Sequence, residues 1–197
     1  MSAEIPRRGF LGLAAAAAAG SVVPWMTGPP AAQAHGGTTR PMDPDWVLAD
    51  LKAGNQRYAA GSQEPSLAAS TNEDFTWGQA PRAVVLGLGD FSVSPEIIFD
   101  QPREDLFVMG VPGSGVNEHA LASVEYATAA LGTRLVLILG QGWGGGSDFE
   151  ESLAAAQASA GQLSGADPLL SKSVAAGQVK ILAGLHDLAT GKVEILR

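Results

Sequence analysis

The stretch Ala83–Leu88 reads AVVLGL, an apolar run long enough for one strand and too short for a helix. Apolar residues that do not alternate with polar ones are typical of a strand buried on both faces, as in a parallel sheet. Two runs of the same kind follow, Leu106–Val111 and Leu135–Leu139. The three runs therefore predict the centre of a parallel sheet.

Helical patterns separate the three predicted strands. A helix is expected over residues 94–100, where proline stands at the first helical position. An alanine-rich helix is expected over 117–131, and another over 147–163, which begins with a capping box, a serine followed three residues later by glutamate. Strands that alternate with helices predict an α/β fold, a mainly parallel central sheet flanked by helices.

The outer segments complete this fold. Helical spacing of apolar residues runs from Trp46 to Tyr58, and Asp43-Pro44 suits a helix start. The last two strands flank a short turn, so they predict an antiparallel edge strand at the C-terminal end. The remaining expectations are a loop or extended arm over 61–80, a helix over 168–176, strands over 179–185 and 193–196, and the turn over 187–191.

The N-terminus has the pattern of an export signal. Arg7 and Arg8 precede an apolar stretch over 11–23, and Ala32-Gln33-Ala34 provides a small-residue cleavage site. The paired arginines resemble a twin-arginine signal, and an ordinary secretory signal is the alternative. The apolar stretch is short of the ~20 residues that a transmembrane anchor needs.

The expected organisation is therefore a signal peptide over 1–34, a flexible lead-in over 35–44 and one domain over 45–197. We expect a bacterial protein exported to the periplasm or the cell exterior, with no membrane attachment after the signal is removed. Its 197 residues suffice for one sizeable core.

Charge and cysteine content exclude several classes of function. The net charge is −8 and the pI is about 4.7, whereas nucleic acids and anionic membranes require a basic surface. The chain has no cysteine, so it has no disulfide and no thiolate nucleophile or metal ligand. We therefore expect no nucleic-acid partner and no disulfide framework.

Ligands of such sheets bind at the carboxyl ends of the strands. Three glycine-rich loops hold that position, residues 87–92, 110–115 and 140–146, and each precedes a helix. Helix N-termini carry partial positive charge, so the loops are a candidate site for a small anion. Gly140, Gly142 and Gly145 also match the dinucleotide fingerprint, although no acidic residue follows at the expected distance.

Segments along the whole domain resemble the β-class carbonic anhydrases. The resemblance covers residues 45–197, which implies the fold of that family and a homodimer or higher oligomer built through the N-terminal helix and the sheet edge. A helical stretch usual in the family is missing after Gly146, which puts that assembly in question. The matching stretches are residues 51–58, 83–87, 95–100, 105–108, 116–127, 131–137 and 187–193.

The resemblance implies a zinc ion held by two cysteines and one histidine, beside an aspartate-arginine pair. The ligand positions are occupied here by Leu88, Gln141 and Gly144, none of which suits zinc. The aspartate remains as Asp90, and the arginine is replaced by Ser92. We therefore expect no zinc, no other cofactor and no catalytic residue.

Other residues of the same loops have two interpretations. Asp90 is a vestigial catalytic group, either a general base or a structural cap of backbone N–H groups. Phe91 and Trp143 either line an apolar pocket or fill the emptied site, and Gly110 replaces a further arginine frequent in the family.

The interpretation that follows is a pseudoenzyme with a binding or structural role. The alternatives are an active carbonic anhydrase with an unrecognised metal site, a hydrolase that uses Asp90, or binding of a small anion or nucleotide. A substitute zinc site is not expected, because the three histidines, His35, His119 and His186, lie in separate elements.

Overall fold

The computed structural model describes residues 42–63, 80–89, 91–111, 115–143 and 147–196. The chain divides into two compact units, Met1–Gln33 and Ala34–Arg197, and every described residue belongs to the second. The predicted signal peptide, its cleavage site and most of the predicted arm over 61–80 lie outside the described residues.

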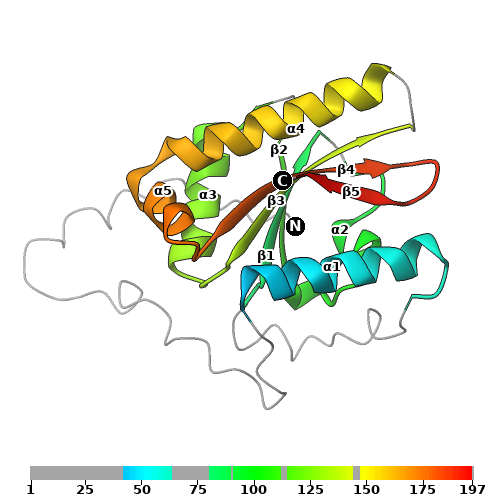
Figure 1. Ribbon diagram of the computed structural model, residues 1–197, viewed down its shortest axis with the longest axis horizontal. Coiled ribbons are helices and arrows are strands. Elements are labelled where there is room, and N and C mark those ends of the chain that lie inside the picture. Colours follow the sequence, from blue (N-terminus) through cyan, green and yellow to red (C-terminus); the bar gives the residue numbers. More distant parts are fainter. Residues whose placement is uncertain (1–41, 64–79, 90, 112–114, 144–146, 197) are drawn as a thin grey trace, which may run out of the picture. The chain divides into compact units, whose positions relative to one another are not determined.

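The described residues form a five-stranded sheet with helices on both faces (Figure 1). The strands are β1 (Ala83–Leu88), β2 (Leu106–Val111), β3 (Leu135–Gly142), β4 (Lys180–Asp187) and β5 (Val193–Leu196). The helices are α1 (Pro44–Ala59), α2 (Pro95–Ile98), the 3-10 turn η3 (Arg103–Asp105), α3 (Glu118–Ala129), α4 (Ser147–Ala166) and α5 (Pro168–Ala175). No helix in this part of the chain is long and apolar enough to cross a membrane.

The sheet confirms the predicted architecture. Its strand order is β2-β1-β3-β4-β5, and the pairs β1 with β2, β1 with β3, and β3 with β4 are parallel. The pair β4 with β5 is antiparallel, as the short turn between them predicts. The carboxyl ends of the four parallel strands therefore meet at one edge of the sheet.

Each face of the sheet packs on its own set of helices. Val84 and Leu86 of β1 belong to the apolar cluster under α3, α4 and α5. Ala83 and Val85 belong to the cluster under α1 and α2, together with Val47 of α1. Because successive side chains of a strand point to opposite faces, an unbroken apolar run is what this two-sided burial requires.

Several element boundaries differ from the sequence predictions, and two of the differences change the description of the candidate site. β3 was expected to end at Leu139, but it continues to Gly142 because β4 pairs with it along its full length. The predicted helix over 94–100 ends at Ile98, since Asp100 has a positive φ of 48° and cannot continue a helix. Gln141 therefore lies within a strand and not in a loop.

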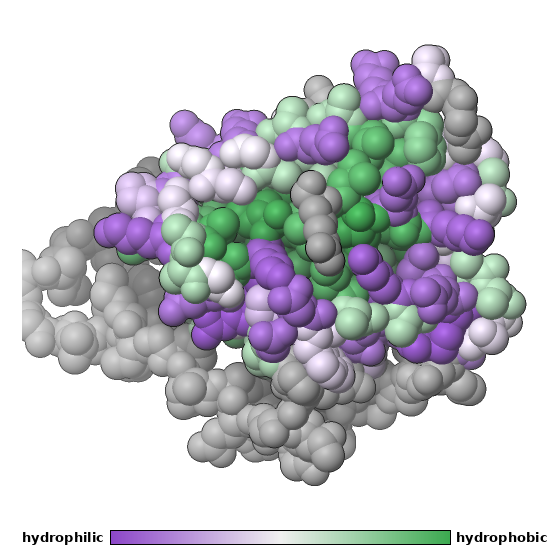
Figure 2. Space-filling view, viewed as in Figure 1, coloured by the Kyte–Doolittle hydropathy of each residue, from purple (hydrophilic) through white to green (hydrophobic). Residues whose placement is uncertain are grey.

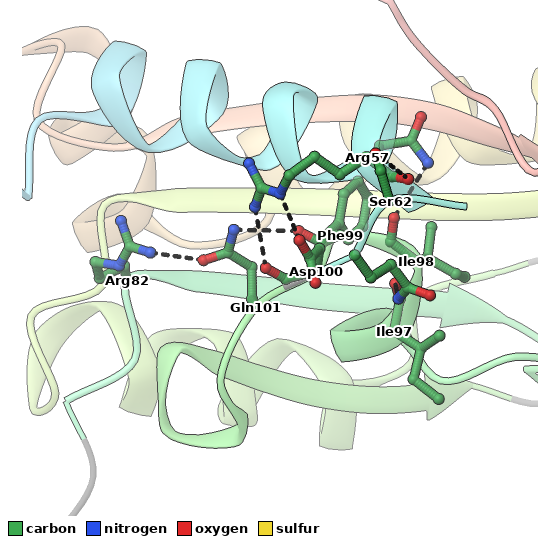
Figure 3. Close-up of polar contacts among 10 residues, drawn as sticks. Arg57, Ser62, Arg82, Ile97, Ile98, Phe99, Asp100 and Gln101 are labelled. Carbon is green, nitrogen blue, oxygen red and sulfur yellow. Dashed lines mark hydrogen bonds and ion pairs between the residues drawn. The ribbon is translucent and has the colours of Figure 1, made fainter. Parts of the chain in front are cut away.

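A buried polar cluster holds α1 against the sheet (Figure 3). The Arg57 guanidinium of α1 forms an ion pair with the fully buried carboxylate of Asp100. Arg82, which precedes β1 and is 3% exposed, donates to Asp50 of α1 at 2.8 Å, to Asp105 at 2.6 Å and to Gln101 at 2.8 Å. Pairing is what makes such burial of charge tolerable, so these contacts fix the position of α1.

Candidate functional site

Gln141 and Ser92 are the two predicted site residues that the structure brings into direct contact. The side-chain Oε1 of Gln141 accepts a hydrogen bond from the backbone N–H of Ser92 at 3.3 Å. Alternation along β3 places Gln141 on the same face as Leu137 and Leu139, the face that α1 covers. The position where the resemblance implies a zinc-binding histidine thus carries an amide whose oxygen accepts a hydrogen bond from the loop over 87–92.

Leu88 is the last residue of β1 and is half-buried. Its side chain packs against the apolar cluster under α3, α4 and α5, so it contacts the opposite face from Gln141. A leucine side chain has no atom that coordinates a metal. This position therefore contributes to packing.

Phe91 covers the carboxyl end of β1 on the α1 face. A Cβ atom built on Gly87 would lie 2.1 Å from Cζ of Phe91, so the ring lies directly on the glycine backbone. The ring is half-buried and packs against the α1-face cluster. The aromatic side chain occupies the space beside β1 where the loop over 87–92 leaves the strand.

Gly140 and Gly142, at the end of β3, allow helix α4 to approach the sheet closely. A Cβ atom on Gly140 would lie 2.9 Å from the backbone oxygen of Ser152, and one on Gly142 would lie 3.2 Å from Cα of Phe149. Both contacts are with α4, so the glycines allow close packing of helix on strand. The described part of the dinucleotide fingerprint thus has a packing role, and Gly145 lies outside the described residues.

The remaining predicted site residues are placed as follows. Trp143 is 69% exposed and follows β3 directly. Gly110 is exposed in β2, where a Cβ atom would have ordinary contact, 3.4 Å from the oxygen of Gly89. Asp90 and Gly144 lie outside the described residues, and so do parts of all three glycine-rich loops.

His186 is a buried residue beside the candidate site, which the sequence pattern did not predict to lie there. It pairs in register with Gln141 across β3 and β4, and in a parallel pair such partners point to the same face. The side chain is 1% exposed, and its ring centroid lies 6.1 Å from that of Tyr58 in α1. The alternation of β4 would have placed it on this face, had the strand been predicted to extend beyond Leu185.

The surroundings of His186 favour the neutral imidazole. Neither ring nitrogen has a hydrogen-bond partner among the described residues. Burial lowers the pKa of His186 below its ordinary value, and the nearby charge of Asp187 opposes this shift only in part. His186 is therefore a neutral, buried group beside the candidate site.

The residues that the structure describes do not fit a zinc ion. A structural or catalytic zinc site uses at least three protein ligands from cysteine, histidine or carboxylates. Among the residues that the structure describes, no group of three or more such side chains is close enough to hold a metal. Leu88 has no donor atom, and the Gln141 oxygen already accepts from the Ser92 N–H.

Comparisons with known proteins agree with the fold. A family model described as "Carbonic anhydrase" matches residues 83–163. Carbonic anhydrase 2 of Mycobacterium tuberculosis and a carbonic anhydrase of Mycolicibacterium smegmatis are each 41% identical over 91 residues. Each alignment covers 46% of this chain and 44% of the relative, so the chain spans less than half the length of these relatives.

Solved structures show the same architecture at low sequence identity. The β-carbonic anhydrase CcaA gives a TM-score of 0.57 at 17% identity, covering 77% of this chain and 95% of that one. A tetrameric β-carbonic anhydrase from Sordaria macrospora gives 0.51 at 17% identity, covering 77% and 94%. Residues 83–163 are therefore similar to the carbonic anhydrase family, and the described domain has the fold of the β-carbonic anhydrases.

Proposed function

We propose that this chain is a non-catalytic member of the β-class carbonic anhydrases, with a binding or structural role. The observation that carries the proposal is the bond between the Ser92 N–H and Oε1 of Gln141. Among the described zinc-ligand positions, Gln141 is the one whose side chain has an atom that could bind a metal. That oxygen instead accepts a hydrogen bond from the protein itself.

The chemistry of the family explains why these replacements matter. A catalytic zinc ion lowers the pKa of its bound water, so that hydroxide attacks carbon dioxide near neutral pH. The ion needs several strong protein ligands to remain bound at its site. Leucine offers none, and an amide oxygen that already accepts a hydrogen bond is a poor substitute for an imidazole.

Packing around β1 supports the same proposal. The Phe91 ring lies against the backbone of Gly87, and Leu88 packs into the core on the other face. Filling a former site with apolar side chains avoids the free-energy cost of a cavity. The end of β1 is thus built for packing.

Metal content and carbon dioxide hydration test this proposal directly. The mature chain, purified without chelator, is expected to carry far less than one zinc per chain by mass spectrometry of the metal. Stopped-flow hydration of carbon dioxide is expected at the uncatalysed background rate. Stoichiometric zinc together with catalysed hydration would contradict the proposal and favour an active enzyme with another metal site.

A variant with restored ligands provides the matched control. Leu88→Cys, Gln141→His and Gly144→Cys together supply the ligand types that the family uses. We expect this triple variant to bind zinc, whereas the unaltered chain does not. A folded triple variant that takes up no zinc would contradict the assignment of these three positions.

We also propose that the chain is exported by the twin-arginine route. The paired arginines Arg7 and Arg8 before the apolar stretch support this route. Replacing both with lysine is expected to leave the unprocessed precursor inside a bacterial cell, as seen by fractionation and immunoblotting. Normal export of the double-lysine variant would instead indicate an ordinary secretory signal.

Self-association is a further part of the proposal. The similar enzyme from Sordaria macrospora is described as tetrameric. In this chain β5 lies at the end of the strand order, so its outer edge is unpaired within the described sheet. We expect a homodimer or larger oligomer, and light scattering coupled to size-exclusion chromatography measures its mass. A monomer at micromolar concentration would contradict this expectation.

A further inference from the structure

A groove lies between helix α1 and strand β5, away from the zinc-ligand positions. Its volume is about 530 Å³, within the range of small-molecule sites. One wall is formed by the second half of α1, and the other by β5 and the turn before it. Figure 2 shows apolar surface over β4 and β5, between α4 and α1.

The inner surface of the groove is apolar. Phe99 lines it and is itself 0% exposed. Val193 and Ile195 project from the same face of β5, because they stand two residues apart in one strand. Both side chains are half-buried and pack against the cluster under α1. An apolar body of a ligand would remove the exposed parts of Val193 and Ile195 from water.

Asn55 fixes the two walls relative to each other. Its Nδ2 donates to the oxygen of Gly191 at 2.9 Å and to that of Ile98 at 3.2 Å. Its Oδ1 accepts from the N–H of Val193 at 2.8 Å. Both amide protons are used, so Asn55 positions the groove and does not bind its occupant. A site held in this way loses little conformational freedom on binding.

The charges at the groove have one sign. Lys52 of α1 and Lys192 of the turn before β5 line it from opposite walls, and both are exposed. The other lining residues are uncharged, and Gln56 adds an exposed amide. Neither lysine belongs to an ion pair in the described part of the chain. On a chain of net charge −8, this is a local cationic site.

We propose that this groove binds a small amphiphilic anion, a carboxylate with an apolar chain. The chain would lie on Phe99, Val193 and Ile195, and the carboxylate would lie between the two lysine ammonium groups. The groove is on the same face of the sheet as Gln141, but none of its lining residues is a zinc-ligand position, so either proposal can fail without the other.

Octanoate and octan-1-ol are matched probes, since they differ in the charge of the head group. Isothermal titration of the full mature chain is expected to show octanoate binding about tenfold more tightly than the alcohol, since an exposed ion pair contributes modestly. The difference should shrink as salt is added, because salt screens exposed charges. Equal affinity of the two probes, or no octanoate binding at millimolar concentration, would overturn the proposal.

Variants assign the binding to this groove. The double variant Lys52→Gln with Lys192→Gln is expected to bind octanoate about tenfold more weakly and to bind octan-1-ol with unchanged affinity. Lys172→Gln, at an exposed lysine of α5 that does not line the groove, is the charge-matched control and should bind as the unaltered chain does. Ala60→Trp, which places a large ring at the groove, should abolish the binding of both probes. If octanoate bound equally well after the two lysine substitutions or after Ala60→Trp, the proposed site would be wrong.

Discussion

The imidazole of His186 is enclosed by the sheet, by Tyr58 of α1 and by its strand neighbours. Because its surroundings favour the neutral form, the folded protein takes up a proton less readily at this residue than the unfolded chain does. The unfolded imidazole titrates near ~6.5. Between that value and the lowered pKa of the folded state, the unfolded chain binds more protons.

The stability of the protein is therefore expected to fall as the pH drops below ~6.5, by at most about 1.4 kcal/mol per pH unit from this group. Urea unfolding followed by tryptophan fluorescence from about pH 8 to about pH 5 measures the slope. His186→Phe should reduce the slope, since the ring no longer titrates. His119→Gln, at an exposed residue of α3, should leave it unchanged, and equal slopes in all three proteins would contradict the assignment.

A second residue-scale prediction concerns Gly87 and Phe91. Gly87→Ala is expected to destabilise the fold by about 1–3 kcal/mol, because the added methyl would overlap the Phe91 ring. Gly115→Ala is the control, since a Cβ atom there meets nothing within 4 Å. In the background of Phe91→Ala, the cost of Gly87→Ala should largely disappear. A double-mutant cycle by urea unfolding measures this coupling, and additive costs would show that the ring is not the cause.

At the scale of elements, α1 and α4 depend on glycine in different ways. Gly54 of α1 lies against the backbone of Phe99, and a Cβ atom there would come within 1.7 Å of its oxygen. Gly161 of α4 is exposed, and a Cβ atom there meets nothing within 4 Å. One glycine permits a close approach of two segments, whereas the other only lowers the helix propensity.

Gly54→Ala is therefore expected to destabilise the protein by about 2–4 kcal/mol, through displacement of α1. Gly161→Ala should stabilise it by roughly 0.5–1 kcal/mol. Thermal and urea unfolding of the two variants measure both changes. Effects of the same sign would mean that the contact between α1 and Phe99 does not determine the cost.

At the scale of the whole molecule, the local pattern of the chain predicted the sheet and its C-terminal antiparallel pair. Unbroken apolar runs of strand length alternate with capped helices, and few folds satisfy both. Contacts between distant segments were not predictable in this way. The continuation of β3 to Gly142 depends on β4, and the turn at Asp100 depends on Arg57 of α1. The burial of His186 depends on the same tertiary packing.

The proposed loss of zinc binding has a consequence for global stability. A ligand that binds only the folded state, present at a concentration 100 times its dissociation constant, raises the free energy of unfolding by about 2.7 kcal/mol. We expect neither zinc nor a chelator to shift the melting temperature of the unaltered chain. Differential scanning calorimetry measures this, and the triple variant with restored ligands is the positive control. A chelator-dependent fall in the melting temperature of the unaltered chain would contradict the expectation.

The close packing of α4 on Gly140 and Gly142 also limits how this chain can be engineered. A side chain at Gly140 would displace α4 and one at Gly142 would crowd it, so both are poor positions for a grafted ligand. Ser92 and Trp143 are exposed, so their positions carry no such restriction. A designer who wishes to install new chemistry on this scaffold should therefore vary the residues around the helix and leave the two glycines unchanged.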